Sequence, residues 1–453
     1  MVGARGRIQG IATRPATVRR EGQTWVGHRA GAASASTASR CGGGRRGTSH
    51  TARHEPGQRS TAESCGIQEG APWEASWIAR VPSHLRILIV GGGIAGLALG
   101  RALRAQGVVP EIIERAASWP AAGTGLYLPA NGVRALGTLG LADALLARAV
   151  RMSHQRILDH TGRRLAEIDL ATLWGPVGPC VGITRNELHR ILLDGAAGVP
   201  MRLGSSVTAL GLEGDEVNVA FADGSTGHYD LVVGADGINS SIRRIAFGIR
   251  PRHLGQVSWR FLVDHSGAIE TWTAMLGRRR AFLALPVGPN RLYCYADLAS
   301  PAAEDPAERD LDRFRKLFAD FSEPVPSILG ELASFDSIHF SPIEEVVVDT
   351  WAQGRVVLIG DAAHATSPNM AEGASMALED ALVLSQLLTT QRSPVEALSA
   401  FSERRRARIS WVQQRSHRRD RIRTLPVTLR NLALRLAGTA IYRRDYRPLF
   451  ERP

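Results

Sequence analysis

The stretch ILIVGGGIAGLALGRALRAQG, residues 87–107, joins an apolar segment to a glycine-rich turn and a further apolar segment. Its uncharged run from Ile87 to Gly100 is fourteen residues long and is bracketed by arginines. A membrane-spanning helix needs about 20 apolar residues, so the run is too short to span a bilayer. The pattern instead predicts a strand, a turn and a helix over 94–106, followed by a second strand over 110–115. The stretch therefore predicts a βαβ unit.

Three glycines of this stretch, Gly91, Gly93 and Gly96, follow the spacing G-x-G-x-x-G. In a nucleotide-binding turn the first glycine permits the turn, the second lets the backbone approach a pyrophosphate, and the third lets helix and strand pack closely. The start of the helix, at Ile94 and Ala95, then offers free N–H groups to the anion. The motif predicts a phosphate site, and glycines that serve packing alone are the alternative.

An acidic residue, Glu114, ends the next predicted strand, 18 residues after Gly96. In dinucleotide-binding folds an acid at this place accepts hydrogen bonds from a ribose. The strand before the glycines, the helix after them and this acid together favour a dinucleotide site over structural glycines. They do not distinguish NAD from FAD.

The chain has 453 residues, of which 44% are hydrophobic, so it is long enough for two or three domains. Its four cysteines are widely spaced and form no C-x-x-C pair, which argues against a disulfide scaffold and a zinc site. We expect no metal, a reducing compartment and hence a cytoplasmic location. Redox chemistry then requires a cofactor.

The net charge of +12 is concentrated at the two ends of the chain. Residues 1–83 are rich in Gly, Ala, Ser and Arg, and we expect them to be a disordered or spurious extension. A transit peptide or a nucleic-acid-binding arm is the less favoured interpretation. Residues 403–453 hold 15 arginines and four acidic residues. We interpret the basic helix at 404–423 as a solvated face, expect no nucleic-acid partner, and leave membrane-surface contact through LALRLAG, 432–438, open.

Two further apolar segments end in an aspartate beside a glycine. DLVVGADGINSSIR, residues 230–243, contains Asp236-Gly237, and RVVLIGDAAH, residues 355–364, contains Gly360-Asp361. A carboxylate at the end of a strand can contact a ligand or cap the next helix. Two such ends far apart in sequence suggest one site assembled from separate segments.

These three stretches together resemble the single-component aromatic hydroxylases, FAD-dependent monooxygenases with the para-hydroxybenzoate hydroxylase fold, over residues 86 to about 420. The resemblance implies an α/β fold with a Rossmann-like FAD-binding domain interleaved with a mostly antiparallel substrate sheet, plus C-terminal helices. It assigns FAD contacts to matching positions of this chain: Gly91, Gly93, Ile94, Ala95, Gly96, Glu114, Arg115, Arg185, Val207, Asp236, Gly237, Gly360, Asp361, Gly373 and Ala374.

The resemblance also implies domain bounds. It predicts an FAD-binding domain over 84–255 and 341–390, with a short excursion into the substrate domain near 152–180. The substrate domain is expected over 256–340 and a C-terminal helical segment over 391–453. No transmembrane segment is expected.

The activity implied by the resemblance is NAD(P)H reduction of FAD, O2 addition to give a C4a-hydroperoxide, and hydroxylation or epoxidation of a small, usually aromatic, substrate. Pro368 and the helix from Gly373 are expected beside the flavin ring, and Arg260 is expected to contact an anionic substrate or the hydroperoxide. Glu372 stands where many members carry Gln. We expect it to turn away from the ring or to be held protonated, because a carboxylate would oppose anionic reduced flavin.

Other functions remain open from the sequence. A flavin-dependent reductase of the same fold would use NAD(P)H without O2. Flavin halogenases carry a W-x-W-x-I-P stretch and a catalytic lysine, whereas the one lysine of this chain, Lys316, stands outside such a context. A non-enzymatic flavin-binding or basic nucleic-acid-binding protein is supported only by the terminal arginines.

Overall fold

The first strand, turn and helix form as the glycine stretch predicts. The structure is a computed structural model that describes residues 85–119, 124–264 and 269–453. β1 (Ile87–Val90) is buried at every position, α1 (Ile94–Ala105) follows the glycines, and β2 (Glu111–Glu114) pairs parallel with β1. The βαβ prediction is therefore confirmed. The expected extension at 1–83 lies outside the described residues.

A six-stranded sheet is built around β1. Parallel pairing joins β8 to β2, β2 to β1, β1 to β12 and β12 to β19, and β18 is antiparallel at the edge. Because parallel strands end at the same edge, the turns after β1, β12 and β19 come together there. The strands, in spatial order, are β18 (Ala352–Gln353), β19 (Val356–Leu358), β12 (Leu231–Gly234), β1, β2 and β8 (Met201–Leu203).

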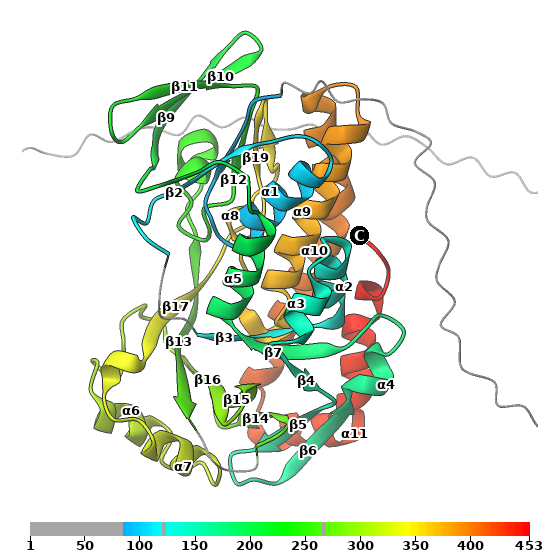
Figure 1. The fold of residues 1–453 in the computed structure, drawn as a ribbon. Coiled ribbons are helices and arrows are strands. Elements are labelled where there is room, and N and C mark those ends of the chain that lie inside the picture. Colours follow the sequence, from blue (N-terminus) through cyan, green and yellow to red (C-terminus); the bar gives the residue numbers. More distant parts are fainter. Residues whose placement is uncertain (1–84, 120–123, 265–268) are drawn as a thin grey trace, which may run out of the picture. The chain divides into compact units, whose positions relative to one another are not determined.

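Helices from distant parts of the chain pack beside this sheet. α9 (Gly373–Thr390) contacts α1, α2 (Ala130–Thr138) and α10 (Pro394–Thr424), and these helices lie side by side in Figure 1. α5 (Arg185–Gly195) packs on α1 and begins at Thr184, whose hydroxyl accepts a hydrogen bond from the Glu187 N–H at 3.3 Å. Through α9, the chain therefore returns to the neighbourhood of the glycine-rich turn after β1, some 280 residues further along.

A seven-stranded sheet forms the second layer. All neighbours in it are antiparallel except β14 and β5, which are parallel. Residues 152–180 contribute its last two strands, and β17 extends it to Glu345, five residues past the boundary expected at 340. The strands, in order, are β17 (His339–Glu345), β13 (Arg252–Asp264), β16 (Arg291–Ala299), β15 (Arg280–Gly288), β14 (Trp272–Leu276), β5 (His154–Asp159) and β6 (Arg164–Asp169).

An aromatic core covers part of the seven-stranded sheet. Trp259 of β13 is fully buried against Phe314 and Phe318, and its indole N–H donates to Asp305 at 3.1 Å. α6 (Leu311–Leu317) and α7 (Val325–Gly330) carry the covering side chains.

The remaining elements are short. Three-stranded sheets are formed by β11 (Thr226–Tyr229), β10 (Glu216–Phe221) and β9 (Val207–Glu213), and by β3 (Gly125–Leu128), β7 (Cys180–Thr184) and β4 (Val150–Met152). Short helices are α3 (Ala142–Leu146), α4 (Leu170–Trp174), α8 (Asp361–His364), a π-helix at Arg243–Phe247 and 3-10 turns at Phe335–Ser337, Pro368–Met370 and Arg447–Leu449.

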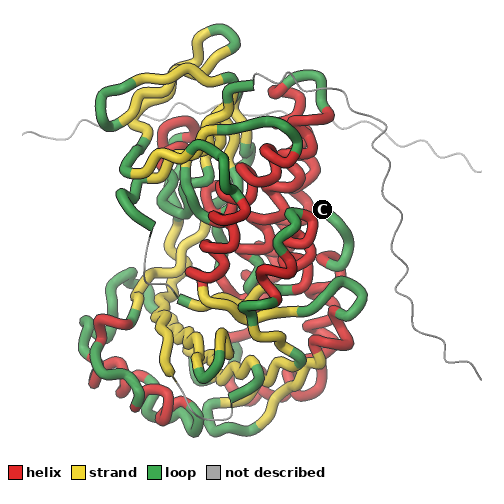
Figure 2. The backbone as a smooth tube through the Cα atoms, viewed as in Figure 1, coloured by secondary structure: helices red, strands yellow, loops and turns green. Residues whose placement is uncertain are grey.

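Two C-terminal helices connect the layers. α10 packs on α9, and near its end Asp420 accepts a hydrogen bond from Gln256 of β13 at 2.9 Å. α11 (Val427–Tyr446) lies against β6 (Figure 2). Within the described ranges, no helix is long and apolar enough to cross a membrane. The predicted fold class is confirmed: a parallel nucleotide sheet, a mostly antiparallel second sheet and C-terminal helices.

Candidate active site

A cavity of about 880 Å³ is lined by both large sheets and by α9, α10 and α11. Most of the residues expected from the sequence line it. Those in its lining are Gly93, Ile94, Ala95, Arg115, Arg185, Asp236, Gly237, Arg260, Asp361, Pro368, Gly373 and Ala374. Those outside its lining are Gly91, Gly96, Glu114, Val207 and Gly360. The cavity thus brings together residues from the three strand ends and from the second sheet.

The three glycines of the first turn have different surroundings. Gly91 has φ +113°, and a Cβ added there would lie 2.4 Å from the Ala235 carbonyl oxygen. A Cβ on Gly96 would lie 1.9 Å from the Gly91 carbonyl oxygen, so the helix and the turn are in close contact. A Cβ on Gly93 would meet no atom of the protein within 4 Å. The first and third glycines therefore serve packing, while the second leaves its space for a ligand.

Glu114 and Val207, two of the residues expected to contact FAD, both contact other groups of the protein. Glu114 accepts hydrogen bonds from the N–H groups of Gly92 at 2.9 Å and Ala116 at 3.0 Å. A carboxylate has about four acceptor sites, so these bonds leave capacity for a ribose hydroxyl. Val207 is buried in β9, opposite Phe221.

In the turn after β12, the side chain of Asp236 accepts hydrogen bonds from the residues that follow it. The Asp236 carboxylate accepts hydrogen bonds from the Ser240 hydroxyl, from the Ser241 N–H at 2.6 Å and hydroxyl at 2.8 Å, and from the Ile242 N–H at 3.3 Å. Gly237 has φ +75°, and a Cβ added there would meet no atom within 4 Å. The carboxylate therefore caps the following turn, one of the two roles that the sequence allowed, while the glycine backbone faces the cavity.

The turn after β19 leaves its aspartate exposed. Gly360 has φ +59° and ψ −143°, a conformation that glycine adopts readily, and its N–H donates to the buried Asp380 of α9 at 2.9 Å. Asp361 is exposed to the cavity, and no hydrogen bond from the described residues reaches its carboxylate. This carboxylate is available to a ligand.

The chain then passes along the cavity to the start of α9. Ala371 has φ +51°, in the left-handed region that a residue with a Cβ seldom adopts. No side chain caps α9, so the N–H groups of its first turn, from Gly373, face the cavity unsatisfied by a capping group. A helix start of this kind stabilises negative charge.

Glu372 lies at this helix start and is 2% exposed. Its Oε2 accepts a hydrogen bond from Asn131 Nδ2 at 2.9 Å, and its Oε1 is buried without a partner among the described residues. Burial, together with the nearby charge of Glu379, raises the pKa of Glu372 to about 8. At neutral pH the carboxyl is therefore mostly protonated, the second of the two states expected from the sequence.

Comparison with known proteins decides the family. Residues 84–416 match the FAD binding domain family. A 2-heptyl-3-hydroxy-4(1H)-quinolone synthase of Pseudomonas aeruginosa is 35% identical over 81% of this chain and 98% of its own. An FAD-dependent urate hydroxylase of Klebsiella pneumoniae is 30% identical over 72% of this chain and 87% of its own. The chain belongs to the FAD-dependent monooxygenases.

A solved relative shares the fold as well. The structure of Klebsiella pneumoniae HpxO complexed with FAD and uric acid superimposes on the present structure with a TM-score of 0.75 and 25% sequence identity. The superposition covers 81% of the present chain and 97% of the HpxO chain. FAD is the cofactor of this family, and NAD(P)H is its usual cosubstrate. The cavity fits FAD: the open space at Gly93, the free carboxylate of Asp361 and the uncapped start of α9 suit a pyrophosphate, a polyol chain and an electron-rich ring, respectively.

The second sheet supplies a polar group of residues to the same cavity. Arg260 of β13 donates from Nη1 to the Ser341 hydroxyl at 3.0 Å, and its guanidinium lies 5.7 Å from the centre of the Tyr295 ring. His339 stands opposite Arg260 in the sheet register, and partial burial together with the charges of Arg260 and Arg185 lowers its pKa. Tyr293 and Tyr295 of β16 also line the cavity.

Some arginines of α10 are buried or paired, which differs from the prediction. Residues 404–423 were expected to form a solvated face, but Arg405 is completely buried and pairs with Asp380 at 2.7 Å and Glu379 at 2.8 Å. Arg423 pairs with the buried Asp297 of β16. Arg404, Arg406 and Arg421 are exposed, as the prediction requires. The prediction was wrong for Arg405 and Arg423 because it counted charges along α10 alone, whereas the acidic partners of these two residues come from α9 and the second sheet.

The sequence analysis also did not predict that α10 and α11 line the cavity. α10 contributes Gln413, Arg419 and Arg423, and α11 contributes Arg430 and Tyr442. A helical apolar period would have indicated that each helix has a buried face, but not which cavity the face adjoins.

Proposed function

We propose that this monooxygenase uses FAD, NAD(P)H and O2 to hydroxylate a small, electron-rich aromatic ring that carries an acidic hydroxyl or a similar anionic group. One observation carries the proposal: a single cavity joins the uncapped start of α9 and Asp361 to Arg260, His339 and Tyr293. The names of the relatives, a quinolone synthase and a urate hydroxylase, support an oxygen-bearing heterocycle as the substrate class.

Arg260 is proposed to bind the anionic group of the substrate. Ser341 holds the guanidinium in place, and the aromatic ring of Tyr295 lies beside it, so the orientation of Arg260 is fixed before a substrate enters. His339, whose lowered pKa keeps the imidazole neutral at pH 7, is suited to accept a proton from a substrate hydroxyl. Loss of that proton would make the ring more electron-rich.

FAD supplies the chemistry of hydride acceptance and oxygen activation when bound. The chain's part is to place the substrate against the flavin, to exclude water and to stabilise charge. The first-turn N–H groups of α9 favour negative charge near the flavin ring, and the protonated Glu372 adds no opposing charge. Pro368 is proposed to lie against the ring with its backbone.

NAD(P)H is proposed to bind transiently, because the sequence has no second G-x-G-x-x-G stretch.

The reducing compartment inferred from the cysteines stays a prediction. Among the described residues, Cys180 and Cys294 are buried free thiols.

The test is to purify the chain, record its visible spectrum, and follow NADH, NADPH and O2 consumption with hydroxypyridines, hydroxyquinolines, purines and aromatic acids. We expect a yellow protein whose NAD(P)H oxidation rises with one class and yields a product one oxygen atom heavier. A protein that binds no FAD on reconstitution would overturn the proposal. Substrate reduction without O2 consumption would assign it to the reductases.

A variant pair tests the substrate end separately. Arg260→Gln should raise KM for an anionic substrate about 10- to 100-fold, since a charged hydrogen bond is worth about 1.5–3 kcal/mol, and leave the FAD content unchanged. Arg250→Gln, an exposed arginine outside the cavity lining, is the control. Equal KM values in the two variants would remove Arg260 from the binding site.

A further inference from the structure

The outer face of α11 is unusually apolar for a surface helix. Leu429, Leu432 and Leu436 are 57%, 54% and 79% exposed, and their spacing places them on one side of the helix. Of the eight large apolar side chains that the described residues leave exposed, four fall in the segment 425–436. Ala433 and Ala440 are exposed on the same side. A contiguous exposed apolar stripe of this kind marks an interaction surface.

The opposite face of α11 is firmly attached to the protein. Arg430 is 1% exposed and donates to the carbonyl oxygens of Gly277 at 2.5 Å and Leu276 at 3.1 Å. A Cβ on Gly438 would lie 2.7 Å from the Ala166 side chain, so helix and strand β6 are in close contact. The leucines therefore cannot turn inward without breaking this packing.

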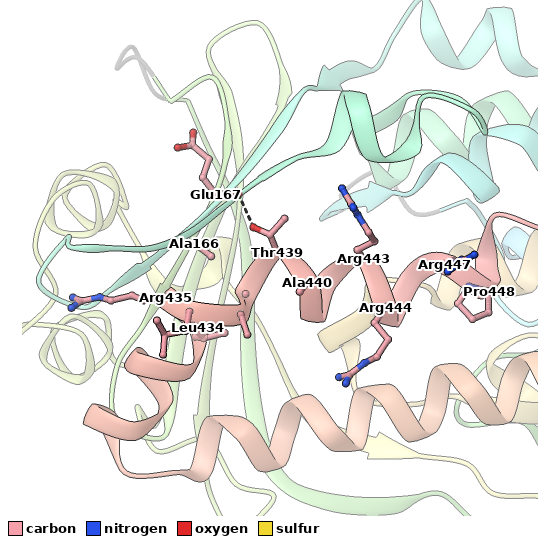
Figure 3. Close-up of a pocket in the computed structure, with 13 residues that line it drawn as sticks. Ala166, Glu167, Leu434, Arg435, Thr439, Ala440, Arg443, Arg444, Arg447 and Pro448 are labelled. Atoms are coloured by element: carbon pink, nitrogen blue, oxygen red, sulfur yellow. Dashed lines mark hydrogen bonds between the residues drawn. The ribbon is translucent and has the colours of Figure 1, made fainter.

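Arginines continue the leucine stripe. Arg443, Arg444 and Arg447 are exposed at the C-terminal end of α11, and Arg435 lies beside the leucines. Figure 3 shows Arg435, Arg443 and Arg444 spaced along α11 and Arg447 just beyond its end. These residues and Glu167 of β6 are among those that line an open groove of about 700 Å³.

Of these four arginines, only Arg444 forms an ion pair with a carboxylate of the described residues. Glu167 is paired with Arg156 at 3.2 Å and Arg164 at 2.8 Å. Asp445 is 1% exposed and faces Arg419 at 3.3 Å, while its contact with Arg444 is 3.7 Å long. The exposed face of α11 thus combines leucines with arginines and contains no exposed acidic residue.

We propose that the outer face of α11 docks on an anionic membrane surface. Leu429, Leu432 and Leu436 enter the boundary between headgroups and acyl chains, and Arg443, Arg444 and Arg447 pair with anionic headgroups, as in helices that lie in the plane of a bilayer. A second copy of this face suits it less, because the face offers arginines no carboxylate partner. The proposal goes beyond the proposed reaction and does not depend on it.

Docking in this orientation has a consequence for the cavity. Arg430, Leu434 and Tyr442 of the same helix line the cavity. The width of one helix, about 10 Å, would then separate the cavity from the lipid phase.

The experiment measures flotation of the full chain with vesicles of phosphatidylcholine alone and with vesicles in which about a third of the lipid is phosphatidylglycerol. We expect binding to the anionic vesicles that weakens as salt rises. The double variant Leu432→Gln/Leu436→Gln keeps the charge and should bind at least about tenfold more weakly. Arg443→Gln/Arg444→Gln should lose about 5- to 25-fold on anionic vesicles only.

Matched controls separate this surface from general charge and hydrophobicity. Leu212→Gln, at a leucine of β9 that is 60% exposed, and Arg244→Gln/Arg250→Gln, at two exposed arginines near the Arg243–Phe247 π-helix, should bind as the wild type does. Melting temperature confirms that each variant folds.

Three results would overturn the proposal: no vesicle binding by the wild type, equal binding by the wild type and the leucine variant, or a wild-type dimer in sedimentation that the leucine variant converts to monomer. The second would assign binding to charge elsewhere in the chain. The third would assign the face to self-association.

Discussion

The turns after β12 and β19 are neighbours in one sheet and each contains an aspartate beside a glycine, yet the two carboxylates are used differently. Asp236 accepts hydrogen bonds from the residues that follow it, Ser240 to Ile242. Asp361 is exposed to the cavity, and its turn is held instead by Asp380 of α9 through the Gly360 N–H. One turn is stabilised from within, and the other from a distant helix.

The difference shows how a carboxylate becomes available to a ligand. A turn whose backbone is stabilised by another element does not need its own side chain as a cap. Asp380 in turn is fixed by His364 at 2.6 Å and Arg405 at 2.7 Å. Burial would raise the pKa of Asp380, but the charges of His364 and Arg405 outweigh it, so the pKa is lowered and the carboxylate stays ionised.

The largest expected effect concerns Glu372. Like Asp361, this residue follows β19 in the chain and has a carboxyl oxygen without a hydrogen-bond partner among the described residues. Its pKa is about 8 in the folded chain against an ordinary value of 4.5, so the folded state holds a proton that the unfolded state has lost between these pH values. Wild-type stability should fall as pH rises through this window, by about 3 kcal/mol or more. Glu372→Gln removes the titrating group, so its melting temperature should gain on the wild type from pH 5 to 8.

Glu403→Gln, the same substitution at an exposed residue outside the cavity lining, provides a control for the pH series. A constant difference between Glu372→Gln and the wild type across the range would show that Glu372 is ionised in the folded chain. The flavin reduction potential of the two proteins at pH 7 adds a second readout. No difference in potential would remove this carboxyl from the chemistry.

Asp361→Ala tests the exposed carboxylate. Because it supports no hydrogen bond within the described protein, the apoprotein should melt as the wild type does. FAD affinity should fall about 10- to 100-fold, the value of a charged hydrogen bond to the cofactor. Titration of apoprotein with FAD, followed by flavin fluorescence, measures the change; a lowered apoprotein melting temperature with unchanged FAD affinity would reverse the two roles.

Asp236→Ala should give the opposite pattern. Removal of the cap leaves the Ser241 N–H without its partner and should destabilise the chain by about 1–2 kcal/mol. FAD affinity, measured on the folded fraction, should change less than in Asp361→Ala. If Asp236→Ala instead loses more FAD affinity than stability, the distinction between the two turns fails.

The smallest effect is expected at Gly237. Its φ of +75° disfavours any residue with a Cβ, but no atom lies within 4 Å of the added carbon, so Gly237→Ala should cost only about 1 kcal/mol. Chemical denaturation measures this cost. A loss of several kcal/mol would mean that the turn is more tightly packed than the turn after β19.

The sequence determined a large part of the fold. The glycine spacing, the apolar strands and their terminal aspartates are local patterns, because backbone conformation and burial of a strand depend on nearby residues. They predicted the βαβ unit and the strand ends that meet at one edge. Most of the site residues implied by the family resemblance line the cavity, but they are a minority of the residues in its lining. They also allowed either role for Asp236 without choosing between them.

Only the tertiary structure decided which charges are paired. Arg405 and Arg423 belong to a basic helix in the sequence, but their partners, Asp380 and Asp297, are 25 and 126 residues away. The same is true of Glu372, whose pKa depends on its burial at the start of α9, beside Asn131 of α2. Solvation and the electric field at a side chain are set by atoms that folding brings near, and no local pattern contains them.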